Sequence, residues 1–317
     1  MGSASVQGPL WGAKAQDWSE LTEPGQQPFY EAVFDALGIG PDTRLLDVGC
    51  GAGLALQLAT KRGATVAGLD AAEELVAVAR GRNPDADVRV GDLEQLPFPD
   101  ATFTAATSFN AVQYASDPTA ALRELRRVLV PGSPVAVLTW GPPERSEMRD
   151  VLAAIGGLLP PPPPGAGGPF ALSGPGALEA LVTGAGLRVG VDGEVPTPYA
   201  YPDVATAVRA QAATGPAVRA AAHSGEAAVT DALTAVMRRY RRDGGVRLET
   251  WSATSSPAPE RAPRGPRAGS WCGRRACGTA PRRASPRCAG RSPGARRARG
   301  CRSGPAPGGR RSPLPAG

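Results

Sequence analysis

An acidic strand end followed by three alternating glycines constrains this chain more than any other segment. Residues 45–53 read Leu-Leu-Asp-Val-Gly-Cys-Gly-Ala-Gly, and the apolar segment 54–59, which favours a helix, follows directly. Glycine has no Cβ, so such a run allows positive φ angles and lets a small ligand lie directly on the main chain. The pattern predicts a buried strand, a sharp turn and a helix. It places Asp47 at the carboxyl end of the strand, where open α/β sheets bind their ligands.

Two kinds of ligand compete for such a loop. The dinucleotide fingerprint Gly-x-Gly-x-x-Gly/Ala places a pyrophosphate at the helix N-terminus, but its last small residue would fall on Leu54. In addition, a carboxylate at Asp47, ahead of the first glycine, repels a pyrophosphate and attracts an ammonium or a sulfonium. The loop therefore favours a cationic ligand over a nicotinamide dinucleotide.

Two further predicted strands end in acidic residues. The strand at 65–70 ends on Asp70, placed to accept hydrogen bonds from both hydroxyls of a ribose. The strand at 87–93 carries Asp92 near its end. Either acid alone is explained as well by a turn or a helix cap. In series with the glycine loop, the two acids favour a nucleoside-containing ligand.

This series resembles the motifs of the class I S-adenosylmethionine-dependent methyltransferases. The residues from Asp47 to Gly53 match the first motif of that family, Asp-x-Gly-x-Gly-x-Gly, at every fixed position. About residues 11–141 look like the type 11 subfamily, which includes the ubiquinone and menaquinone biosynthesis enzymes. The resemblance implies a Rossmann-like α/β fold, with a seven-stranded, mostly parallel sheet of order 3-2-1-4-5-7-6 flanked by helices. We expect the seventh strand to begin near Val246.

The resemblance also implies S-adenosyl-L-methionine as the cofactor. In the family, an acid at the position of Asp92 accepts the adenine amino group, and the segment after the fourth strand holds the methionine portion. The residues expected to bind the cofactor are Asp47, Gly49, Cys50, Gly51, Gly53, Asp70, Ala71, Asp92, Leu93, Phe109 and Asn110.

Aromatic residues ahead of the first strand are candidates for a lid. In related enzymes an N-terminal segment closes over the cofactor, so Trp11, Trp18 and Tyr30 are candidate lid residues, with simple packing as the alternative. Gln113, after the fourth strand, is expected to help position the reaction.

Tyr114 and His223 are the two catalytic candidates. Methyl transfer is an in-line displacement at a sulfonium carbon, so proximity, alignment and exclusion of water supply much of the acceleration. A general base helps only where the nucleophile must lose a proton. Tyr114 is placed to hydrogen-bond an acceptor or simply to pack. His223, the single histidine, lies in a polar helix end, where a solvent-facing histidine is the competing interpretation.

The composition divides the chain into four parts. We expect an N-terminal helical lid segment at 1–40, a cofactor-binding core at 41–142, and a small helical substrate cap with the last strands at 143–251. The part at 252–317 holds fifteen arginines against the single acid Glu260, with much Pro, Gly and Ser, and is expected to be disordered. It fits a basic arm for nucleic acid, an inert extension, or an out-of-frame reading of GC-rich DNA, which we favour.

The expected function is methyl transfer from S-adenosylmethionine to oxygen, nitrogen or carbon of a small molecule, in metabolism or natural-product biosynthesis. The alternatives are an NAD(P)-dependent oxidoreductase, a nucleic-acid methyltransferase and a non-enzymatic S-adenosylmethionine-binding protein. Segment 108–111 lacks the Asn/Asp-Pro-Pro-aromatic motif of enzymes that methylate base amino groups, which argues against a nucleic-acid substrate. We expect no metal site, because the cysteines form no Cys-x-x-Cys pair, and no membrane segment, which favours a cytoplasmic protein.

Overall fold

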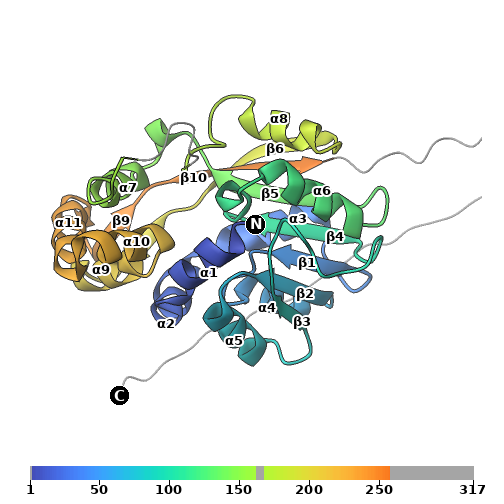
Figure 1. The fold of residues 1–317 in the computed structure, drawn as a ribbon, viewed down its shortest axis with the longest axis horizontal. Coiled ribbons are helices and arrows are strands. Elements are labelled where there is room, and N and C mark those ends of the chain that lie inside the picture. Colours follow the sequence, from blue (N-terminus) through green and yellow to red (C-terminus); the bar gives the residue numbers. More distant parts are fainter. Residues whose placement is uncertain (1, 162–167, 258–317) are drawn as a thin grey trace, which may run out of the picture. The chain divides into compact units, whose positions relative to one another are not determined.

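A seven-stranded sheet organises the computed structural model, which describes residues 2–161 and 168–257 (Figure 1). Its order is β3-β2-β1-β4-β5-β10-β6, with the last strand of the described residues inserted between β5 and β6. The strands β1 to β5 run parallel, and β10 pairs antiparallel with both of its neighbours. The predicted order 3-2-1-4-5-7-6 is confirmed. The strands of this sheet are β1 Arg44–Val48, β2 Thr65–Asp70, β3 Asp87–Val90, β4 Ala105–Phe109, β5 Val135–Trp140, β6 Val189–Pro196 and β10 Trp251–Pro257.

The prediction that the seventh strand begins near Val246 is wrong. Val246 belongs to β9 (Gly245–Leu248), which pairs with β7 (Tyr199–Tyr201) and β8 (Arg241–Arg242) in a separate three-stranded sheet. The apolar alternation of Val246 and Leu248 buries one face of this small sheet, whereas β10 is held by backbone pairing on both edges. The expected disordered part at 252–317 therefore begins too early, because β10 extends to Pro257. The remainder of that part lies outside the described residues.

Helices cover both faces of the large sheet. Successive strand residues point to opposite faces, so Leu45 packs in the cluster with α3 and α4, whereas Leu46 packs in the cluster with α6 and α8. The helix α6 begins after Asp117, whose carboxylate accepts hydrogen bonds from the backbone N–H groups of Thr119 and Ala120. The covering helices are α3 Gln27–Leu37, α4 Leu54–Lys61, α5 Glu73–Arg82, α6 Pro118–Val128 and α8 Ala177–Gly184.

A helical cap forms a third core beside the sheet. Its helices surround the small sheet and pack around Met148, Leu233 and Leu248. Figure 1 shows them grouped together, next to the N-terminal helices. The cap helices are α7 Met148–Gly156, α9 Val204–Ala212, α10 Gly215–Ser224 and α11 Glu226–Arg239.

The N-terminal segment runs between the helices of the large sheet and the cap. It consists of α1 (Ala4–Gly12), α2 (Ala15–Asp17), the π-helical turn η1 (Trp18–Thr22) and the 3-10 turn η2 (Glu23–Gln26). The helix α1 contacts α5 on one side and α10 on the other. Two ion pairs join the segment to the cap: Lys14 Nζ lies 2.9 Å from Glu226, and Arg209 lies 2.6 Å from Asp17. Among the described residues, no helix has the length and apolar character needed to cross a membrane.

Candidate active site

The glycine loop takes the left-handed conformations that its sequence predicts. The φ angles of Gly49, Gly51 and Gly53 are 79°, 54° and 81°. The N–H groups of Gly49 and Cys50 both donate to the carbonyl of Leu69, at 2.7 and 3.0 Å. A Cβ added at Gly49 would lie 2.2 Å from the Cβ of Ala111. The loop therefore needs glycine for both its backbone angles and its close packing.

The loop lines a cavity of about 1180 Å³, a volume that includes its open mouth. Residues from the sheet, the N-terminal segment and the cap surround this space, so all three parts of the fold contribute to one site. The predicted site residues that line it are Trp11, Trp18, Tyr30, Gly49, Cys50, Gly51, Asp70, Ala71, Leu93, Phe109, Asn110 and Tyr114.

Asp70 stands at the end of β2 as predicted. One carboxylate oxygen accepts a hydrogen bond from Gly51 N and the other from Ala72 N, both at 2.9 Å. Burial raises the pKa of Asp70, whereas the hydrogen bonds from these backbone N–H groups lower it. Each oxygen keeps a second lone pair, so the carboxylate can still accept hydrogen bonds from a ligand in the cavity.

Asp47 does not line the cavity, contrary to its expected role in cofactor binding. Its side chain is 1% exposed and accepts a hydrogen bond from the hydroxyl of Thr107 at 2.7 Å. Burial raises the pKa of Asp47 to about 7. The side chain lies on the same face of β1 as Leu45, beside Thr107 of the neighbouring strand β4. Its position supports the loop rather than a ligand contact.

Asp92 does not line the cavity either. Its carboxylate is hydrogen-bonded to the backbone, in part to the N-terminal segment. One oxygen accepts from Ala4 N at 3.3 Å, and the other accepts from Glu94 N at 2.9 Å. Gly2 packs so closely that an added Cβ would lie 2.0 Å from the Asp92 carboxylate. The neighbouring residues Gly91 and Leu93 line the cavity instead.

Three other predicted residues do not reach the cavity. Gly53 packs against Ala79 and begins α4. Gln113 is buried and donates to the side chain of Asn110 at 3.4 Å. His223 is exposed in the last turn of α10. The solvent-facing interpretation therefore describes the position of His223, and nothing in the cavity supports a catalytic role for it.

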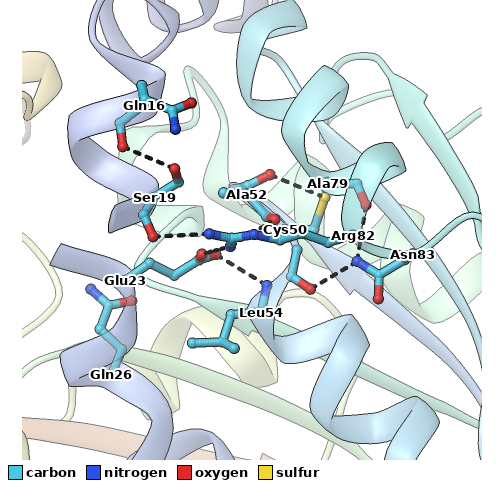
Figure 2. Close-up of polar contacts among 12 residues, drawn as sticks. Gln16, Ser19, Glu23, Gln26, Cys50, Ala52, Leu54, Ala79, Arg82 and Asn83 are labelled. Carbon is cyan, nitrogen blue, oxygen red and sulfur yellow. Dashed lines mark hydrogen bonds and ion pairs between the residues drawn. The ribbon is translucent and has the colours of Figure 1, made fainter. Parts of the chain in front are cut away.

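The sequence analysis missed Glu23 and Arg82, which join the N-terminal segment to the glycine loop (Figure 2). Glu23 lines the cavity, is 1% exposed, and accepts a hydrogen bond from Leu54 N at 3.2 Å. It is paired with Arg82, which also donates to the carbonyls of Ala52 at 3.1 Å and Ser19 at 2.9 Å. Burial raises the pKa of Glu23, whereas Arg82 lowers it.

This carboxylate caps the helix that follows the loop. The N-cap position of α4 is Gly53, which offers no side chain to the first helical N–H groups. Glu23 supplies an acceptor from 31 residues away, and its negative charge faces the positive end of the helix dipole. No local pattern signals such a contact, so only the folded structure reveals it.

Aromatic residues gather at the cavity. Seven of the aromatic residues that the structure describes line it, although aromatic residues make up only 5% of the chain. Trp11 meets Trp18 and Tyr114 edge-on, with ring centroids 5.2 and 5.6 Å apart. The indole nitrogens of Trp18 and Trp140 are buried without a hydrogen-bond partner. Burial raises the pKa of Tyr114, and the neighbouring Trp140 indole lowers it in opposition.

The arrangement defines a class of protein, a Rossmann-like α/β chain with a nucleoside-type ligand site at its first three strands. Residues 46–137 match the type 11 methyltransferase domain family. A malonyl-acyl-carrier-protein O-methyltransferase from Erwinia pyrifoliae is 33% identical over 200 residues, which are 63% of this chain and 71% of that relative. The chain belongs to the class I S-adenosylmethionine-dependent methyltransferases of type 11, and its cofactor is S-adenosylmethionine.

Other similarities are more partial. An enzyme of the same name from Serratia marcescens is 38% identical over 124 residues, 38% of this chain and 49% of that relative. The chain thus spans about half the length of that relative. The crystal structure of the YcgJ protein from Bacillus subtilis shares the fold, with a TM-score of 0.51 at 18% identity, covering 74% of this chain and all of that one.

Proposed function

We propose that this chain transfers a methyl group from S-adenosylmethionine to a small-molecule acceptor. The observation that carries the proposal is a single cavity with two different walls. One wall holds the glycine loop and Asp70, and the other holds uncharged side chains of the cap. The two relatives described above are named O-methyltransferases, which supports oxygen as the acceptor atom.

The residues of the first wall fit the cofactor. Asp70 would hold the ribose hydroxyls, and the methionine portion would lie beside Gly51, because no atom lies within 3.4 Å of a Cβ added there. Trp18 Nε1 is 3.5 Å from that added Cβ and lacks a partner, so it would donate to the cofactor carboxylate. When bound, the cofactor supplies an activated methyl group on a positively charged sulfur.

The remaining chain aligns the reactants and keeps water out. The N-terminal segment contacts α5 and α10, and its residues Trp11 and Trp18 line the cavity. Such enclosure and alignment supply much of the acceleration of a displacement reaction. Burial raises the pKa of Tyr114 above its ordinary value, so its neutral hydroxyl would serve as a hydrogen-bonding group rather than as a base.

Several further expectations stay predictions. They are the cytoplasmic location, the division into four parts, and the absence of a nucleic-acid partner. The arginine-rich residues from 258 onward lie outside the described part of the chain. Sequencing the gene tests their out-of-frame origin, which requires that another frame after codon 250 encode an apolar strand followed soon by a stop.

Calorimetric titration with S-adenosylmethionine, S-adenosylhomocysteine and NAD tests the proposed function. We expect the first two to bind and NAD not to bind. Asp70→Asn should weaken binding about 10- to 150-fold, corresponding to about 1.5–3 kcal/mol for charged hydrogen bonds. The exposed Asp85→Asn is the matched control and should bind like the unsubstituted chain. Binding of NAD alone, or an Asp70→Asn variant with unchanged affinity, would overturn the proposal.

A further inference from the structure

The helix α1 crosses the ends of two strands on the cofactor side of the cavity. At its start, Ala4 N donates to the carboxylate of Asp92, just beyond β3, at 3.3 Å. One turn later, Gly8 packs just beyond β2, where an added Cβ would lie 2.4 Å from the carbonyl oxygen of Ala71. The helix therefore lies beside the part of the cavity that adjoins Asp70, the residue that would hold the ribose.

One face of α1 lines the cavity. Its residues there are Ser3, Ala4, Gln7 and Trp11, which follow the spacing of a helical turn. Ser3 is buried, whereas Gln7 and Trp11 are partly exposed. In the helix, Gln7 stands between Ala4, which contacts the end of β3, and Gly8, which contacts the end of β2. Gln7 therefore brings an amide group to the cavity beside the ends of both strands.

A hydrogen bond fixes the orientation of the Gln7 amide. Trp11 Nε1 donates to Gln7 Oε1 at 3.3 Å, from one turn further along α1. An indole N–H can only donate, so the amide must turn its oxygen, and not its nitrogen, toward Trp11. Among the described residues, none accepts a hydrogen bond from Gln7 Nε2. Gln7 thus keeps two N–H donors and the second lone pair of its oxygen for a ligand.

The cavity wall around this amide is otherwise apolar. At the ends of β2 and β3 and at the start of α5, the lining residues other than Asp70 are Leu69, Ala71, Leu75, Gly91 and Leu93. Such residues contact the faces of a planar base but do not distinguish one base from another. Recognition of the base therefore depends on a polar group at its edge.

A glutamine amide matches the edge of adenine. The N6 amino group of adenine is a donor and the neighbouring ring nitrogen is an acceptor, so one amide can bind both at once. Hypoxanthine has a carbonyl oxygen in place of the amino group, and this oxygen would face the oxygen of Gln7. An amide that was free to rotate could exchange its two ends and bind hypoxanthine as well. The bond from Trp11 opposes that rotation.

We propose that Gln7, rather than Asp92, hydrogen-bonds the adenine edge of the cofactor, and that Trp11 is a positioning residue for its amide. This inference rests on the proposed function. Asp92 does not line the cavity, and its two oxygens accept hydrogen bonds from backbone N–H groups. Specificity for the base then comes from the N-terminal helix and not from the strand end.

Calorimetric titration of the full chain with S-adenosylhomocysteine and S-inosylhomocysteine tests this inference without turnover. The second ligand differs in having hypoxanthine in place of adenine. We expect the unsubstituted chain to bind S-adenosylhomocysteine at least tenfold more tightly than S-inosylhomocysteine. Gln7→Met keeps the length of the side chain and removes the amide, so it should lower this ratio of affinities about tenfold, the size of one bidentate contact to a base.

Two further variants separate positioning from a general loosening of α1. Trp11→Phe frees the Gln7 amide to rotate, so it should also lower the ratio. Gln16→Met, on an exposed residue, is the matched control and should leave the ratio unchanged. A loosened helix would weaken both ligands alike and would not move the ratio. If Gln7→Met does not fold, Gln7→Ala replaces it, because alanine is well tolerated in helices.

Asp92→Asn provides the opposing measurement, and we expect it to leave the ratio unchanged. The inference is overturned if the unsubstituted chain binds both ligands equally, if removal of the Gln7 amide leaves the ratio unchanged, or if Asp92→Asn lowers the ratio as much. An unchanged ratio in Trp11→Phe would refute the positioning role of Trp11. Failure of S-adenosylhomocysteine to bind the unsubstituted chain would overturn the proposed function instead.

Discussion

The two sides of the cavity are built from different parts of the polypeptide. The cofactor side includes the main chain of the loop from Gly49 to Gly51 and the strand ends that meet it. The side toward the cap is lined by residues of α7, β7 and α9, such as Met148, Tyr199 and Gln211, which lie outside any glycine loop. A main-chain surface changes only when the fold changes, whereas a side-chain surface changes with single substitutions. The difference teaches why one fold can keep its cofactor while its acceptor varies.

Of the substitutions considered, Gly49→Ala should reduce cofactor binding and stability the most. The new Cβ would lie 2.2 Å from the Cβ of Ala111, at a φ of 79° that alanine rarely adopts. We expect S-adenosylhomocysteine binding to fall more than 100-fold and the free energy of unfolding to fall by about 2–4 kcal/mol. Calorimetry and urea unfolding measure these changes. Gly81→Ala, where nothing lies within 4 Å, should be neutral or slightly stabilising, and equal effects at both positions would contradict this account.

Asp47→Asn should reveal a pH dependence that belongs to the cofactor side. The pKa of Asp47 is about 7 in the fold, above its ordinary value of 3.8, so its ionisation destabilises the folded chain. The free energy of unfolding should therefore fall as pH rises from about 4 to about 7, by about 2–4 kcal/mol more in the unsubstituted chain than in Asp47→Asn. Urea unfolding at several pH values measures the difference. Parallel pH profiles of the two proteins would refute it.

Glu23→Gln should separate the charge of Glu23 from its hydrogen bond. The amide oxygen can still accept from Leu54 N, but Arg82 loses its countercharge. Because Arg82 is 28% exposed, we expect a loss of about 1–3 kcal/mol, less than for a fully buried pair, together with weaker S-adenosylhomocysteine binding. Thermal unfolding and calorimetry check both effects. The exposed Glu144→Gln is the control, and a Glu23→Gln variant as stable as this control would rule out the proposed tie.

Glu226→Gln should have the smallest effect. It removes the ion pair with Lys14 that joins the N-terminal segment to the cap, but the Glu226 side chain is 68% exposed. Solvent screens such pairs, so we expect at most about 0.5 kcal/mol in thermal unfolding. A loss above 1 kcal/mol would mean that the cap is held in place by charge and not by its apolar core.

The sequence predicted the cofactor side better than the acceptor side, for a physical reason. Glycines with positive φ and an acid at a strand end are local signals, so the loop and Asp70 were foreseen, whereas the strand order was implied by the resemblance to the methyltransferase family. The hydrogen bond from Ala4 N to the Asp92 carboxylate was not foreseen, because 88 residues separate these two positions along the chain. Glu23 and Arg82 escaped notice for the same reason. The strand β10 was missed because its place depends on hydrogen bonds from two neighbours, not on apolar alternation.

The hydrogen bond that Leu54 N donates to Glu23 joins two segments that lie far apart in the sequence. We therefore expect these two segments to unfold locally as one unit. When residues 19–26 detach, α4 loses its N-terminal acceptor, and Arg82 loses its bonds to Glu23 and to the carbonyl of Ser19. Native-state hydrogen exchange should therefore show the Leu54 amide exchanging at the rate of the η2 amides, as one cooperative unit. Because the cofactor lies on the same loop, its binding should slow exchange in both stretches equally.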